Sequence, residues 1–184
     1  SGIMYYFLTA SKDTTIFSQQ PIQNTGLDEI LEVSKVYYGD LKDTARSLVK
    51  FDLNSLSSKL SSGEVTMSKA ELILRETQPS EIPLQYSLHI HPISQSWEMG
   101  VGTRFDNIST DGCTWNYRKS GSKWLPTEIP NGGLATGSYN GAGGMWYTAS
   151  EQTQSYEYQS TDLEVDVSSS LSFWLDDSYP NEGF

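Results

Sequence analysis

The ten residues Thr44–Leu53, TARSLVKFDL, constrain the fold of this chain more than any other stretch. Apolar and charged side chains are interleaved along it, namely Leu48, Val49, Phe51 and Leu53 with Arg46, Lys50 and Asp52. Successive side chains of a strand point to opposite faces of its sheet. The pattern therefore predicts a strand that is buried on one face and partly covered on the other, with Phe51 fully buried. Leu56 and Leu60 follow it as an apolar cap.

Other segments alternate in the same way and predict further strands. They are Ile30–Tyr38 before a turn at Gly39 and Asp40, Met67–Leu74, Leu84–Ile93, and the two stretches around Tyr156–Tyr158 and Leu163–Val167. The continuous apolar run Ile3–Leu8 predicts a first strand before them. Ser168 is the predicted N-cap of a short helix, because Leu171, Trp174 and Leu175 follow at helical spacing. Many short strands with little helix favour an all-β fold, an antiparallel β-sandwich of jelly-roll type with one or two short helical segments.

Length and charge limit the classes of partner. A chain of 184 residues is long enough for one core, so we expect a single domain over residues 1–184. Its net charge of -11 repels phosphate backbones, which argues against nucleic acid as a partner. Ile3–Leu8 is too short to span a membrane, and no membrane partner is expected. The lone Cys113 leaves no internal disulfide to form, so stability must come from packing.

Glycine is concentrated in one region of the second half. Seven of the 15 glycines lie between Gly121 and Gly144, and we interpret residues 118–150 as a long Gly-rich insertion. Trp124 and Trp146 flank it, and together with Tyr139 and Tyr147 they are the candidate contacts to a ligand or to another subunit. The alternative is that both tryptophan rings fold down and pin the loop onto the body of the protein, since large rings are rarely left exposed.

The sequence contains few residues whose type and spacing indicate a metal site or a catalytic site. His89 and His91 stand on one strand face, but a zinc site needs further ligands and Cys113 has no partner cysteine. Asp106 and Asp111 are weak candidates for calcium, without the spacing of an EF-hand. No G-x-S-x-G motif of a serine hydrolase occurs. Glycoside hydrolases use a pair of carboxylates, but among 23 acidic residues such a pair is expected by chance and is no evidence for that activity. We therefore expect no cofactor and no enzyme activity.

Five blocks of sequence carry a family resemblance. They are Arg46–Leu53, Met67–Leu74, Ser96-Trp97-Glu98, Thr114-Trp115-Asn116, and Leu163–Ser168 with Trp174. In order and rough spacing they resemble DNRLRE domains over about residues 13–184. Those domains are jelly-roll modules that are related to carbohydrate-binding modules and occur in cell-surface and secreted proteins. The core expected from the strands and from this likeness comprises Leu48, Phe51, Leu53, Leu72, Leu74, Leu88, Trp97, Trp115, Val165 and Trp174.

The chain also departs from that family. The insertion after Tyr117 is long, and the closing strand that follows a glycine such as Gly183 is absent. The resemblance therefore predicts a domain that is truncated at its C-terminal end. The natural polypeptide is then expected to continue past Phe184 and to pair beside the first or the organising strand.

The general sequence texture is similar to that of structural proteins from marine tailed bacteriophages that contain this module. It implies a non-enzymatic virion structural or adhesion module that contacts other virion proteins or identical copies. A carbohydrate-binding module for cell-surface polysaccharide is the alternative, with an extracellular or cell-surface location in place of the virion. A polysaccharide-degrading enzyme is the third possibility.

Overall fold

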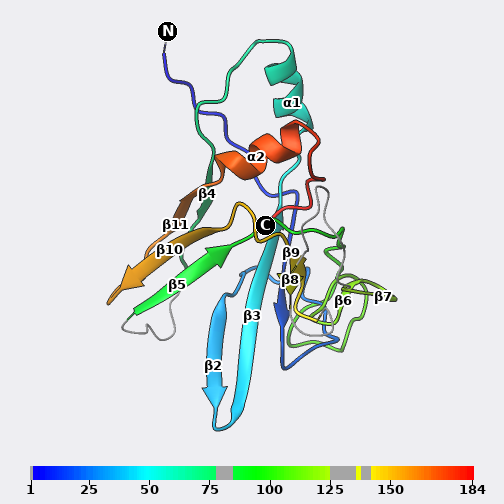
Figure 1. The fold of residues 1–184 in the computed structure, drawn as a ribbon. Coiled ribbons are helices and arrows are strands. Elements are labelled where there is room, and N and C mark those ends of the chain that lie inside the picture. The colour runs from blue at the N-terminus through cyan, green and yellow to red at the C-terminus, as the bar shows by residue number, and fades with distance from the viewer. Residues whose placement is uncertain (1, 78–84, 125–135, 138–141) are drawn as a thin grey trace.

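The structure is a computed structural model that describes residues 2–77, 85–124, 136–137 and 142–184 (Figure 1). Within these ranges the chain forms antiparallel strands and two short helices, which confirms the expected all-β character. The strands group into one three-stranded sheet and four two-stranded ones.

The predicted organising strand is the centre of the three-stranded sheet. β3 spans Leu41–Lys50 and lies between β1, Lys12–Phe17, and β2, Ser34–Tyr38. β1 pairs with the second half of β3, from Ala45 to Lys50, and β2 pairs with the first half, from Leu41 to Ala45. A two-residue turn at Gly39 and Asp40 joins β2 to β3. Gly39 has a φ of 61° while Asp40 stays at negative φ, as a type II′ hairpin turn requires.

The remaining strands form pairs. β5, Gln85–Ile90, pairs with β10, Gln152–Glu157, and β4, Glu71–Leu74, pairs with β11, Leu163–Asp166. The Gly-rich region contributes four short strands, which are β6 Tyr117–Lys119, β7 Ser122–Lys123, β8 Thr136–Gly137 and β9 Met145–Trp146. β4 is shorter than the predicted strand Met67–Leu74, because only its last four residues have a ladder partner.

Apolar side chains pack on both sides of β3. Val49 belongs to a cluster with residues of β4, β11 and both helices, whereas its neighbour Leu48 belongs to a second cluster with Ile16, Trp97 and Trp124. Six of the expected core residues are buried, namely Leu48, Leu53, Leu72, Trp97, Val165 and Trp174. The other four, Phe51, Leu74, Leu88 and Trp115, are partly buried against the two clusters. Phe51 is therefore not fully buried as expected, because it lies just past the end of β3.

Two helices cover one end of the molecule. α1, Asn54–Ser61, contributes Leu56 and α2, Ser168–Leu175, contributes Leu171 and Trp174 to the first cluster. The expected N-cap at Ser168 is wrong. The capping position is Val167, whose side chain has no oxygen that could accept a hydrogen bond. The Ser168 hydroxyl accepts a hydrogen bond from the backbone N–H of Ala70, and the N–H of Ser168 donates to the Asp166 carboxylate, both at 2.9 Å.

The predicted first strand, Ile3–Leu8, is not a strand in the structure. Residues 2–10, here called the N-terminal segment, have no backbone hydrogen bond to any described residue. From Tyr5 to Leu8 the contacts alternate: the Tyr6 hydroxyl lies 2.8 Å from that of Ser55 and Leu8 packs on the first cluster, while the rings of Tyr5 and Phe7 stack on each other at 6.2 Å. Ile3 and Met4 are both exposed, so the segment presents an apolar surface to solvent.

A fully buried asparagine holds the loops beside the second cluster together. The Asn24 amide donates to the backbone oxygens of Met99 and Cys113 at 2.8 Å, and its oxygen accepts from the N–H groups of Gly26 and Gly102. These four hydrogen bonds replace those that the side chain would make with water, and so offset the cost of burying it. The arrangement leaves Cys113 without any accessible surface.

The last two described residues lie against β3. The N–H and C=O of Phe184 both bond to Val49 at 2.8 Å, and the C=O of Gly183 accepts from the N–H of Ile93. The Phe184 ring packs at 4.8 Å from that of Trp174. Phe184 therefore pairs with the organising strand on the same edge as β2, because both strands use the odd-numbered residues of β3.

Candidate functional site

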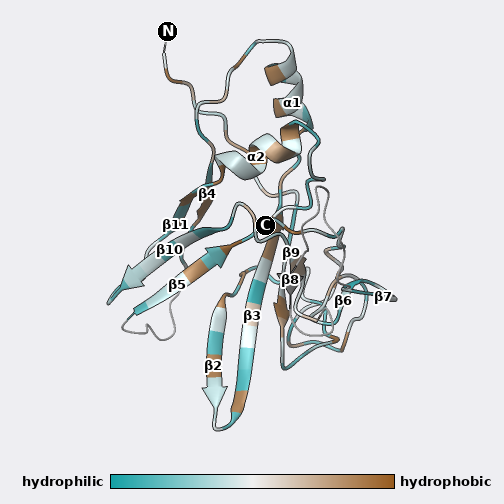
Figure 2. Ribbon diagram, in the orientation of Figure 1, coloured by the Kyte–Doolittle hydropathy of each residue, from teal (hydrophilic) through white to brown (hydrophobic). Residues whose placement is uncertain are grey.

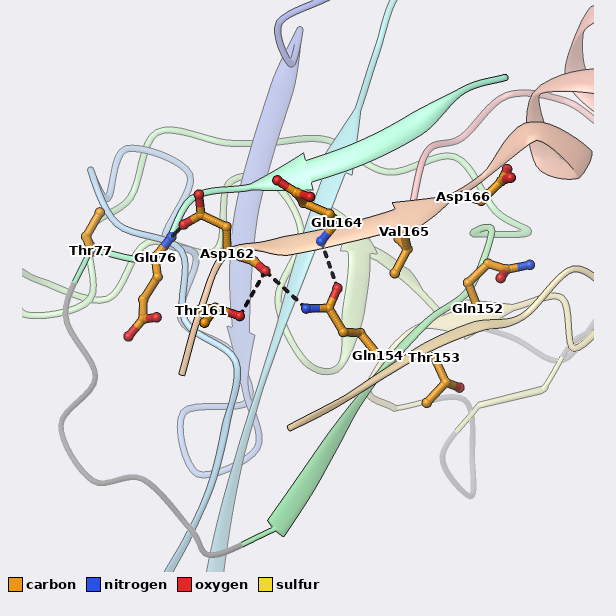
Figure 3. Close-up of a pocket in the computed structure, with 10 residues that line it drawn as sticks. All are labelled: Glu76, Thr77, Gln152, Thr153, Gln154, Thr161, Asp162, Glu164, Val165 and Asp166. Atoms are coloured by element: carbon orange, nitrogen blue, oxygen red, sulfur yellow. Dashed lines mark hydrogen bonds between the residues drawn. The ribbon is translucent and has the colours of Figure 1, made fainter. Parts of the chain in front are cut away.

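A polar concavity lies where β10 and β11 separate (Figure 3). The Gln154 side chain bridges the two strands: its Nε2 donates to the C=O of Asp162 at 3.0 Å and its Oε1 accepts from the N–H of Glu164 at 2.8 Å. Carboxylate, amide and hydroxyl groups line the rest of the concavity. Such groups suit hydrogen bonding to a polar ligand, since each offers donors or acceptors to hydroxyl groups.

Two of the carboxylates that line this concavity, those of Asp162 and Asp166, accept hydrogen bonds from the protein itself. Asp162 accepts from the N–H of Glu76 at 2.9 Å and lies 3.7 Å from the Arg75 guanidinium. The hydroxyl and N–H of Ser168 hold the pKa of Asp166 below its usual value. A general acid for glycoside cleavage needs a raised pKa. Among the described carboxyl groups with a displaced pKa, which are Glu151, Asp166 and Asp176, every displacement is downward.

The two histidines of the predicted pair meet a shared carboxylate. The Oε1 of Glu151 lies 2.6 Å from His89 Nδ1 and 3.9 Å from His91 Nε2. The hydrogen bond with His89 is the main reason that the pKa of Glu151 is lowered, and burial is the main reason that the pKa of His91 is lowered. Within the described ranges no three His, Cys, Asp or Glu residues are placed to hold a metal ion.

The weak calcium candidates, Asp106 and Asp111, remain a prediction. Asp106 accepts a 2.5 Å hydrogen bond from the hydroxyl of Thr103, the residue three positions before it. Asp111 is exposed. This is the geometry of a turn whose side chains bond locally.

The four candidate contact residues have different environments. Trp124 is fully buried, and its indole N–H donates to the C=O of Thr114 at 3.0 Å. Tyr147 is buried as well. Trp146 is partly buried, with the Arg46 guanidinium 5.0 Å from its ring centre, and Tyr139 lies outside the described residues. Trp124 and Tyr147 therefore pin the Gly-rich region to the body and are inaccessible to a ligand in this structure.

Two groups of exposed apolar residues lie elsewhere. In the N-terminal segment five large side chains are exposed, by 89% for Ile3, 70% for Met4, 78% for Tyr5, 41% for Tyr6 and 82% for Phe7. The second group occupies the end of the β2–β3 hairpin, which projects from the body in Figure 1. We call Val36–Leu41 the hairpin tip, where Val36, Tyr37, Tyr38 and Leu41 are all exposed.

The hairpin tip was not predicted as a contact site. A signal was present in the sequence, because Val36, Tyr37 and Tyr38 are consecutive and so place large side chains on both faces of β2. A strand with large apolar side chains on both faces is either buried on both sides or contacts another protein surface. The hydrophobic colour in Figure 2 accordingly reaches the end of β3 that projects from the body.

Comparison with known proteins gives no match: no family model, no curated protein and no solved structure is similar to this chain. Among the described residues no helix is both long and apolar enough to cross a membrane.

Proposed function

We propose that this chain is a non-enzymatic structural or adhesion module of a tailed-bacteriophage virion, with a DNRLRE-like jelly-roll sandwich as its scaffold. It acts through contacts with other virion proteins or with identical copies. The observation that carries the proposal is the exposed apolar surface of the hairpin tip and of the N-terminal segment. The virion itself is inferred from the resemblance in sequence.

The hairpin supports protein contact for an energetic reason. An isolated two-stranded ribbon is marginally stable in water, because it has no sheet face to bury. At the hairpin tip, Tyr37, Tyr38 and Leu41 are 68%, 66% and 60% exposed. Tyrosine is enriched in protein interfaces, where its ring is buried and its hydroxyl finds a partner. A partner surface would stabilise the ribbon and cover these rings together.

Photo-crosslinking during particle assembly tests the proposal. A photoreactive amino acid at Tyr38 is expected to give a covalent adduct with a virion protein or an identical copy, identified by mass spectrometry of purified particles. The same amino acid at the exposed Thr66 of the loop after α1 is the matched control. Absence of the chain from purified particles would contradict the proposal.

A carbohydrate-binding module is the second candidate, and the polar concavity between β10 and β11 is what favours it. A glycan array with the whole chain tests it. Binding that is lost on Gln152→Ala, in the concavity, and kept on Gln159→Ala, outside it, would support sugar recognition there. Loss on Trp146→Ala instead would place the sugar at the Gly-rich region.

A further inference from the structure

We propose that copies of this chain associate head to tail, with the N-terminal segment of one copy adding as a β-strand to the free edge of β2 in the next. The inference rests on the proposed assembly function and names the partner and the contact. β-strand addition of this kind draws affinity from main-chain hydrogen bonds and specificity from alternate side chains.

The donor is the N-terminal segment. It contains no helix or strand, and its N–H and C=O groups bond to no described backbone group. Ile3, Met4, Tyr5 and Phe7 are at least 70% exposed, whereas the Tyr6 hydroxyl reaches that of Ser55 and Leu8 packs on the first cluster. The apolar run that predicted a strand at Ile3–Leu8 is thus exposed and outside any sheet. An added strand supplies the missing ladder, and the exposed apolar run supplies the side chains for a partner.

The acceptor is the outer edge of β2. The two residues that flank a two-residue turn face each other as a hydrogen-bonded pair, so Tyr38 and Leu41 bond within the hairpin. Val36 and Ser34 then bond inward as well, and the N–H and C=O groups of Lys35 and Tyr37 point away from β3. Among the described residues no strand pairs with this edge. Apart from Lys35 it lacks the charges, prolines and bulges that usually protect an edge strand.

A second copy fits the acceptor better than the chain's own segment. Figure 1 places the N-terminus and the hairpin tip at opposite ends of the molecule, so one copy's segment does not lie near its own β2. Both elements therefore remain available at once in a single chain. A contact between unlike surfaces of identical copies continues into a filament or closes into a ring.

Charge supports the same pairing. Two copies with a net charge of -11 each repel one another over most of their surfaces. Residues 2–10 carry no charged side chain, and residues 34–45, the paired part of the β2–β3 hairpin, contain two lysines and two aspartates, a net charge of zero. The proposed contact thus joins two segments that have no net charge, where repulsion between the acidic copies is weakest.

Sedimentation velocity over a range of concentrations tests the association. The wild-type chain is expected to grow beyond a dimer as concentration rises. The donor variant Tyr5→Ser/Phe7→Ser and the acceptor variant Tyr37→Pro should each shift association to concentrations at least about tenfold higher. Proline is tolerated on an edge strand where the lost N–H faced solvent, so the hairpin survives. Phe105→Ser, which removes a ring that is 88% exposed elsewhere, is the control and should associate as wild type.

Mixing the two variants is the decisive experiment. The donor variant keeps a working β2 edge and the acceptor variant keeps a working segment, so the mixture should form a 1:1 dimer that grows no further. A peptide of residues 2–10 added to the wild-type chain should reduce its size, without any substitution in the hairpin. A donor variant that self-associates as wild type, through hairpin against hairpin, overturns the proposal. A wild-type chain that stays monomeric at every concentration also overturns the proposal. The proposed function would survive that result, because it is tested separately by crosslinking in particles.

Discussion

The two halves of β3 belong to one strand, but they pair with different neighbouring strands and have different surroundings. Leu48, in the half that pairs with β1, is 4% exposed, whereas Leu41, in the half that pairs with β2, is 60% exposed. The buried half lies between two apolar clusters and the other half projects from the body (Figure 1). The projecting half of β3 thus keeps backbone hydrogen bonds to a neighbouring strand although its side chains do not pack in a core. Apolar residues in the projecting half therefore do not contribute to the core, and their exposure is the basis of the contact with another surface that we propose.

The largest expected difference between the halves is in stability. Leu48→Ala should lower the free energy of unfolding by about 2 to 5 kcal/mol, because it leaves a cavity in a packed cluster. Leu41→Ala should change it by no more than about 0.5 kcal/mol, as is usual for exposed positions. Urea denaturation of the monomeric chain measures both. Equal losses would mean that the hairpin folds back onto the body in solution.

Gly183 sharpens the comparison through the backbone. A Cβ at this position would lie 2.1 Å from the C=O of Val49 in the buried half, and Gly183 has a φ of +79°. Gly183→Ala should therefore cost about 2 to 4 kcal/mol, from the φ strain and the clash together. Gly39→Ala in the hairpin turn is the matched control, since Gly39 has a φ of +61° and nothing within 4 Å of its Cβ position. Gly39→Ala should cost about 1 to 2 kcal/mol. Equal losses of stability for Gly39→Ala and Gly183→Ala in thermal melts would show that the clash with Val49 contributes nothing.

Phe51 lies between the two extremes. Its ring is partly buried against the first cluster, so Phe51→Ala should cost about 1 to 2 kcal/mol and not the roughly 3 to 5 kcal/mol of a fully buried ring. Lys50→Ala should cost less than that, because the ion pair of Lys50 with Glu182, at 3.5 Å, lies near the surface. A loss of 4 kcal/mol or more at Phe51 would place the ring deeper in the core than the structure does.

The smallest effect concerns hydrogen exchange and needs no substitution. The N–H of Val49 donates to Phe184 in the buried half and should exchange slowly, with the global unfolding of the chain. The N–H of Tyr37 points outward and should exchange quickly in dilute solution. Raising the protein concentration should then slow the exchange of the Tyr37 N–H and leave that of the Val49 N–H unchanged. Fast exchange at Tyr37 that is independent of concentration would leave the edge of β2 without a strand partner.

Sequence patterns predicted the parts of this fold whose cause is local. The interleaved charges of Thr44–Leu53 predicted β3, and Gly39 with Asp40 predicted the hairpin turn, because alternation and turn chemistry act over a few residues. The apolar run Ile3–Leu8 also predicted a strand, but the structure has no strand there. A strand needs a partner edge, and no local pattern shows whether that edge belongs to the same chain.

The candidate site was harder to predict because it depends on distant contacts. Trp124 stands beside a Gly-rich stretch in the sequence, yet its N–H finds the C=O of Thr114 and its ring is buried. Nothing in the sequence around Asn24 indicates that its side chain binds the backbone of Met99 and Cys113, which lie 75 and 89 residues further along the chain. Polar residues that are satisfied only by the finished fold look like ordinary loop residues beforehand.

The burial of Cys113 has a practical consequence for measuring the hairpin. Burial raises the pKa of this thiol to about 12, so almost none of it is thiolate at neutral pH, and thiolate is the form that reacts with maleimides. It is also the single cysteine of the chain. A fluorophore attached at Tyr38→Cys would therefore label one position only, in the otherwise natural sequence. Energy transfer between donor-labelled and acceptor-labelled chains could then follow subunit exchange in real time.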